Sequence, residues 1–258
     1  FFINFNIGVI YFLYLFYIYK TIQMKKIIFL LLVSFSLTQL QAQKSYFACY
    51  NVEVSNDGVS DFAAALDNFM LSDAGAKLPY SVILSEIFFG NADNKFSHQI
   101  CFLAKNAEIL ADWGSKPPPT PEGILLQISF AKNVKVNQTI LGSPLIETSS
   151  LMGDYFNIWQ LNVEDVAVFA NAFTKFSKDT EKMRGSGSFG LYEIIAGSNK
   201  NVTHHFGAYA ANLGEFLKIR EKIITSQKEF EAYDKSTAPI SNVEGVFGGQ
   251  IIKRYNMK

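Results

Sequence analysis

Two pairs of a glutamate and a histidine recur at one spacing, and they are the residues best suited to acid–base chemistry. Glu86 precedes His98 by twelve residues, and Glu193 precedes His205 by the same interval. A short loop of Gly, Asn and similar residues lies midway in each pair, so an antiparallel hairpin would place the carboxylate opposite the imidazole. A carboxylate orients such a ring and raises its basicity, which suits proton transfer.

Three roles remain open for these four candidate catalytic residues. The pairs could transfer protons, or a histidine could bind a metal or haem iron. They could also be a structural hydrogen bond repeated from an ancestral unit, which is the interpretation we favour. His204 stands next to His205 and should point to the opposite face of a strand, so the two are not expected to share a metal. The sequence predicts no metal site and names no cofactor.

The pairs belong to an internal repeat. Val82–Leu110 aligns without gaps on Phe189–Leu217 at an offset of 107, with nine identities. Gly142 matches Gly249 at the same offset. Upstream, apolar residues with helical spacing match as well, namely Val59, Phe62, Ala63, Leu66 and Phe69 with Val166, Phe169, Ala170, Phe173 and Phe176. A fixed offset over so many positions indicates a duplicated unit.

Each copy predicts the order strand, helix, strand, strand, helix, strand. The predicted strands are 46–54, 81–89, 96–104, 155–163, 189–196, 203–211 and 245–255, and the predicted helices are about 60–72, 165–183 and 214–233. In the first copy, four prolines between 117 and 121 break the second helix. A new helix should begin there, capped by Thr120 with Pro121 at its first position. In the second copy, Asn212 sits three residues before Glu215 and resembles a capping box at the start of the helix near 214.

This order is the ferredoxin-like motif, and its tandem arrangement resembles the dimeric α+β barrel superfamily. That superfamily includes antibiotic-biosynthesis-type monooxygenases, chlorite dismutase-like haem proteins and stress-responsive barrel proteins. The resemblance covers about residues 46–256 and rests on element order and duplication. It implies an α+β fold in which two ferredoxin-like units, 43–148 and 149–258, pack sheet to sheet as a barrel within one chain. We therefore expect a monomer.

The N-terminal region predicts export. Met24 is the first methionine, and two lysines, an apolar run at 27–37 and a small residue before Gln43 follow it. This pattern is typical of a bacterial signal peptide over 24–42. Residues 1–23 are interpreted as upstream sequence translated in frame. We expect a periplasmic or secreted protein without a stable membrane anchor after cleavage.

The two cysteines, Cys49 and Cys101, fall on the first and third predicted strands, which are neighbours in this fold. An exported protein allows a disulfide between them. Their counterparts in the second copy are Ile158 and Ala208, both apolar. That comparison favours two buried thiols, because free cysteine behaves as a small core residue.

Composition and motifs narrow the function classes. The formal charge is zero, so nothing indicates binding to nucleic acid. The sequence carries no P-loop, no Cys-x-x-Cys, no zinc-protease motif and no nucleophile elbow. Our leading hypothesis is therefore an exported, non-catalytic module that binds a small apolar molecule between the sheets, or a protein partner. The alternative is a monooxygenase-like or haem-dependent enzyme that uses the Glu/His pairs.

Overall fold

In the computed structural model, the folded unit begins at Lys44. Within it, the described residues are 44–90, 95–111, 119–149, 153–198 and 201–257. The predicted upstream extension (1–23) and signal peptide (24–42) lie outside the described residues. No helix among the described residues is long and apolar enough to cross a membrane.

Both predicted copies form the expected elements. The first copy contains β1 (Tyr46–Val54), α2 (Val59–Leu71), α3 (Asp73–Ala76), β2 (Ser81–Gly90), β3 (His98–Ala104), α4 (Ala107–Ala111), α5 (Pro121–Asn133) and β4 (Val134–Glu147). The second contains β5 (Tyr155–Val163), α6 (Val166–Asp179), α7 (Glu181–Arg184), β6 (Ser188–Ala196), β7 (His204–Ala210), α8 (Leu213–Thr225), α9 (Gln227–Thr237) and β8 (Ser241–Tyr255). The predicted single helices at 165–183 and 214–233 are each divided in two.

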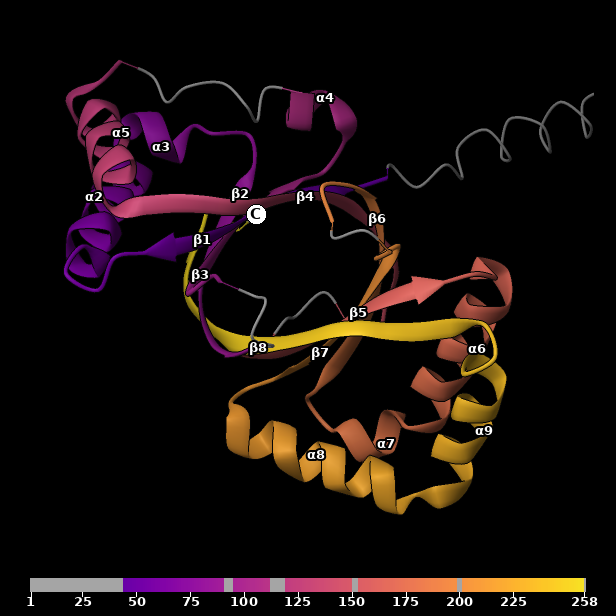
Figure 1. The fold of residues 1–258 in the computed structure, drawn as a ribbon. Coiled ribbons are helices and arrows are strands. Elements are labelled where there is room, and N and C mark those ends of the chain that lie inside the picture. The colour runs from indigo at the N-terminus through magenta and orange to yellow at the C-terminus, as the bar shows by residue number, and fades with distance from the viewer. Residues whose placement is uncertain (1–43, 91–94, 112–118, 150–152, 199–200, 258) are drawn as a thin grey trace, which may run out of the picture. The chain divides into compact units, whose positions relative to one another are not determined.

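The strands close into one barrel within the described part of the chain, in the order β1-β3-β2-β8-β5-β7-β6-β4. Each copy contributes four antiparallel neighbours, β4-β1-β3-β2 and β8-β5-β7-β6, which is the ferredoxin-like order. The long last strands join the copies, because β4 also pairs with β6 and β8 also pairs with β2. Figure 1 shows the ring of strands with α2, α3 and α5 on one side and α6–α9 on the other. The predicted closure within one chain is confirmed.

Two matching glycines lie where the copies join. A Cβ at Gly142 would lie 2.5 Å from the carbonyl oxygen of Glu193, and a Cβ at Gly249 would lie 2.0 Å from that of Glu86. Both distances are far below van der Waals contact. The matched pair in the sequence therefore marks a close backbone approach that only glycine permits at both joins.

Local capping signals place the helix starts as the sequence predicts. The Thr120 hydroxyl accepts a hydrogen bond from the Gly123 N–H (3.1 Å), and Pro121 occupies the first helical turn of α5. The Asn212 side chain accepts from the Glu215 N–H (2.9 Å) at the start of α8. These bonds satisfy backbone donors that a helix start leaves unpaired.

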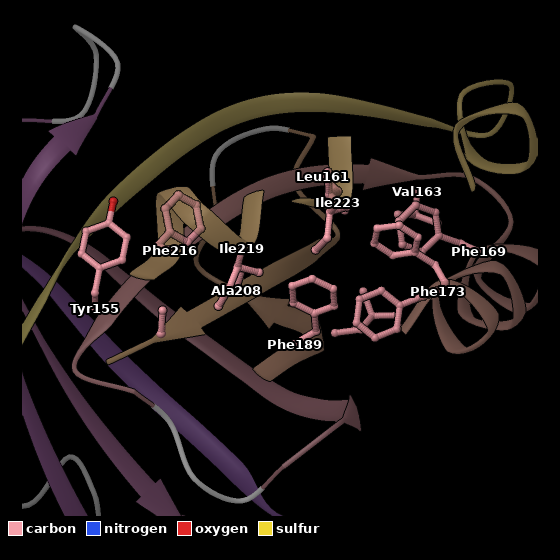
Figure 2. Close-up of a cluster of buried hydrophobic side chains, with 13 residues drawn as sticks. Tyr155, Leu161, Val163, Phe169, Phe173, Phe189, Ala208, Phe216, Ile219 and Ile223 are labelled. Carbon is pink, nitrogen blue, oxygen red and sulfur yellow. The ribbon is translucent and has the colours of Figure 1, made fainter. Parts of the chain in front are cut away.

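Alternation along the strands divides the buried side chains between the barrel interior and two layers against the helices. The first copy packs α2 and α5 on its sheet, and the second packs α6 and α8 on its own. Figure 2 shows the second of these cores, with Phe169 and Phe173 of α6, Ile219 of α8 and Phe189 of β6 turned toward one another. The interior carries a third, smaller cluster that includes Phe247.

The preference for two free thiols was wrong. Cys49 and Cys101 are directly opposite in the β1/β3 register and form a disulfide, with Cα atoms 4.1 Å apart. The comparison failed because it used the wrong counterpart for Cys101. In the β5/β7 register Ile158 faces Gly207, not Ala208. The true counterpart has no side chain and says nothing about a buried apolar position.

Candidate functional site

The structure brings together one predicted Glu/His pair and rearranges the other. Glu86 lies opposite His98 on β2 and β3, as predicted. Glu193 lies opposite His204, not His205. The prediction for the second copy was wrong because its hairpin loop is one residue shorter. The copies match at an offset of 107 on β2 and β6 but of 106 on β3 and β7, so His98 corresponds to His204.

The histidine of each pair belongs to a repeated hydrogen-bond arrangement on the helix side of the sheet. The Ser97 hydroxyl accepts from the Val54 N–H (3.0 Å) and contacts His98 Nδ1 (2.9 Å). In the second copy Thr203 takes the place of Ser97. Its hydroxyl accepts from a β5 backbone N–H (2.9 Å) and contacts His204 Nδ1 (2.9 Å). The hydroxyl residue thus fastens the start of the third strand to the end of the first.

The carboxylates are electrostatic neighbours of these histidines without bonding them in the described contacts. Glu86 is exposed, whereas Glu193 forms an ion pair with Lys44 (3.0 Å). Burial lowers the pKa of both His98 and His204, and the nearby glutamate opposes that effect in each case. Neither pair lines the cavities described below. This geometry supports the structural interpretation of the pairs.

His205 points into the barrel and lines an interior cavity of about 90 Å³. Its Nε2 is buried without a hydrogen-bond partner, and burial lowers its pKa to about 3. The same cavity is lined by the disulfide and by two tyrosines, Tyr192 and Tyr209, whose hydroxyls lie 3.1 Å apart. Glu147, an exposed residue at the end of β4 that does not line the cavity, also bonds the Tyr192 hydroxyl, and partial desolvation raises the pKa of its carboxyl. The interior therefore holds a small polar cluster within apolar walls.

A larger cavity of about 390 Å³ lies in the second copy, between the sheet and helices α6–α9; we call it the second-unit cavity. Its walls are mostly apolar and aromatic, and include Trp159, Leu161, Phe169, Phe176, Phe189, Phe206, Phe216, Ile219, Ile223, Phe230 and Tyr233. Sequence reasoning placed a possible ligand between the sheets and missed this cavity. One signal for the cavity was available in the sequence. The helical region after Asn212 is long and not interrupted by proline, whereas prolines break the corresponding region of the first copy.

One charged side chain is buried in the wall of this cavity. Arg184 is 5% exposed, and its Nε has no hydrogen-bond partner. One terminal nitrogen donates to the Ser177 carbonyl and to the Thr180 hydroxyl (2.9 Å). The guanidinium carbon lies 4.7 Å from the centroid of the Phe189 ring. Burial lowers the pKa of Arg184, with partial compensation from Glu181.

The residues of the second-unit cavity do not fit haem, which the resemblance made a candidate cofactor. Proteins hold haem iron through His, Cys, Met or Tyr, and no His, Cys or Met lines this cavity. Of its tyrosines, Tyr209 bonds Tyr192, and the Tyr233 ring stacks on Phe176 with centroids 4.5 Å apart. The described residues also contain no group of three or more His, Cys, Asp or Glu able to hold a metal ion.

Solved structures share this fold across most of the chain. A proposed monooxygenase from Fusobacterium nucleatum subsp. nucleatum aligns with a TM-score of 0.57 at 12% identity, covering 83% of this chain and 95% of its own. A second proposed monooxygenase, from Lactobacillus acidophilus, aligns with a TM-score of 0.56 at 11% identity, covering 83% and 96%. No protein-family model and no curated protein matches the sequence.

These comparisons contradict our leading functional hypothesis. We expected a non-catalytic binding module, whereas these two structures, which each match over 83% of the chain, are described as proposed monooxygenases. They favour the enzyme alternative. The element order, the closed barrel and these structural neighbours together show that the chain has the dimeric α+β barrel fold, with both ferredoxin-like units in one polypeptide.

Proposed function

We propose that the protein is a monooxygenase-like enzyme that oxidises a flat, apolar ring compound in the second-unit cavity. The observation that carries this proposal is the cavity itself, about 390 Å³ with predominantly aromatic walls. Small-molecule sites are typically concave, mostly apolar and about 300–1,000 Å³ in volume. The described monooxygenases with this fold support the reaction class.

The shape of the walls favours a planar substrate. The ring centroids of Trp159 and Phe206 lie 5.0 Å apart, with an interplanar angle of 31°, and both rings line the cavity. Aromatic walls of this kind bind another ring through offset or edge-on contacts. Burying such a compound would also remove apolar surface from water on both sides of the contact.

The proposed reaction balances with molecular oxygen as the oxidant. When a hydroaromatic substrate has one CH₂ group oxidised to a carbonyl, one oxygen atom enters the substrate and the other leaves as water. The substrate supplies all the electrons, so no further reductant is required. The contribution of the protein would be to orient the ring and to exclude solvent from the reacting carbon.

Oxygen uptake tests this proposal. Purified protein should consume oxygen above the uncatalysed rate with at least one member of a panel of hydroaromatic ketones and naphthalenediols. Ile219→Trp fills the cavity and should abolish the uptake. Leu217→Trp, on an exposed face of the same helix, is the matched control and should not. No uptake with any panel member, or full uptake by Ile219→Trp, would contradict the proposal, and a Soret band at one haem per chain would contradict the account of the cavity.

We further propose that the enzyme works outside the cytoplasm as a monomer. The Cys49–Cys101 disulfide supports the location, since such bonds persist in oxidising compartments. Closure of the barrel by one chain supports the monomer. Cell fractionation should recover a chain starting near Gln43 outside the cytoplasm, and gel filtration should give a monomer mass. A cytoplasmic chain that keeps Met24, or a stable dimer, would be the contrary result.

A further inference from the structure

The buried guanidinium of Arg184 is the feature of the second-unit cavity that its apolar walls do not explain. A buried arginine normally faces a carboxylate or has its donors satisfied. Arg184 appears in none of the ion pairs of the described residues, and its Nε donor has no partner. The side chain nevertheless forms part of the cavity wall.

Its known contacts account for part of the side chain only. The bonds to the Ser177 carbonyl and the Thr180 hydroxyl use a single terminal nitrogen, and they fasten α7 to the end of α6. The Phe189 ring covers one face of the guanidinium. These contacts hold the group in place and leave a charge and an N–H donor beside a cavity large enough for a two-ring molecule.

We propose that Arg184 binds an anionic oxygen of the ligand, so that the second-unit cavity selects flat apolar molecules bearing one carboxylate, sulfonate or phenolate group. This inference rests on the part of the proposed function that makes the cavity a ligand site, and not on oxygen chemistry. An anion at this position satisfies the Nε donor and neutralises the buried charge. The aromatic walls bind the remainder of the molecule.

Two other charged side chains line the cavity. Arg220 and Asp234 line the same cavity and are both exposed. Solvent screens the charges of both side chains. Selection for an anion therefore falls to Arg184, where the interaction is shielded from water.

Two fluorescent probes that differ by one anionic group test the inference. 8-Anilinonaphthalene-1-sulfonate carries a sulfonate, and N-phenyl-1-naphthylamine is its neutral counterpart. Arg184→Gln should weaken binding of the sulfonate probe about 10- to 100-fold, the usual range for a hydrogen bond to a charged group. The neutral probe should change by less than about 3-fold. Lys218→Gln, which removes one positive charge from an exposed position of α8 outside the cavity lining, is the matched control and should leave both probes nearly unchanged.

A wild-type measurement covers the case in which Arg184→Gln fails to fold. The chain contains only three arginines, Arg184, Arg220 and Arg254, so the arginine Nε–H region of a ¹⁵N spectrum is simple to assign. The sulfonate probe should shift the Arg184 signal, and the neutral probe should shift it much less. Equal loss of both probes in the variant, or no shift of this signal, would overturn the inference. If neither probe binds, both the inference and the cavity of the proposed function fail. If binding follows Arg184 but oxygen uptake is absent, only the proposed reaction fails.

Discussion

Protonation of His205 is expected to destabilise the folded protein as the pH falls below the ordinary histidine range. The side chain is 6% exposed, its Nε2 has no hydrogen-bond partner, and burial lowers its pKa to about 3. The unfolded chain binds this proton near pH 6.5, so between about pH 6.5 and about pH 3 the unfolded state holds more protons than the folded state. The stability that neutral His205 contributes is therefore complete above pH 6.5 and is lost as the pH falls toward 3.

The magnitude follows from the width of this window. Each pH unit inside it costs about 1.4 kcal/mol per proton, so lowering the pH from 7.5 to 4.5 should remove about 3 kcal/mol. Urea unfolding of the wild type and of His205→Gln at both pH values measures this difference. Glutamine is a suitable replacement, because Gln99 occupies the matching interior position in the first copy. His98 and His204 remain in both proteins, so their own pH dependence cancels.

The sign of the result decides where His205 lies. If the register instead placed Glu193 beside His205, as the sequence predicted, the carboxylate would raise the pKa of the histidine. The wild type would then lose stability relative to the variant as the pH rises. An equal pH dependence in the two proteins, or this reversed sign, would refute the placement of His205 inside the barrel.

Three further predictions concern the framework. Gly249→Ala should lower the free energy of unfolding by about 1–3 kcal/mol, because the new Cβ would lie 2.0 Å from a backbone carbonyl oxygen of β2. Gly214→Ala should change it much less, because its Cβ would lie 3.3 Å from the end of the Asn212 side chain, and equal effects of the two variants in urea unfolding would argue against the close join. Replacing Cys49 and Cys101 together by alanine should cost about 2–4 kcal/mol, since the bond closes a loop spanning 52 residues; a reductant that leaves the wild-type melting temperature unchanged would show that the bond is absent. Thr203→Val should cost about 1–3 kcal/mol by leaving a β5 N–H unpaired, and a stability equal to the wild type would show that the hydroxyl does not fasten the strands.

Local signals in the sequence were sufficient to predict most of the fold. The strands Tyr46–Val54 and Tyr155–Val163 have the predicted bounds, because period-two alternation and flanking turns depend only on near neighbours. Thr120 and Asn212 mark helix starts for the same reason. The duplication then predicted a closed barrel within one chain, because two ferredoxin-like units can join through their last strands.

Register and cavity were decided by the tertiary structure. A gapless alignment cannot show that one hairpin loop has lost a residue, yet that single residue exchanges His204 and His205 between the two faces of the sheet. The same shift concealed the glycine that corresponds to Cys101. The second-unit cavity depends on how α8 and α9 pack over β5–β7, and apolar residues that fill a core have the same sequence pattern as those that surround a hollow. Arg184 follows this rule too, because a buried arginine and an exposed one look alike in the sequence, so only the folded chain shows a charge beside the cavity.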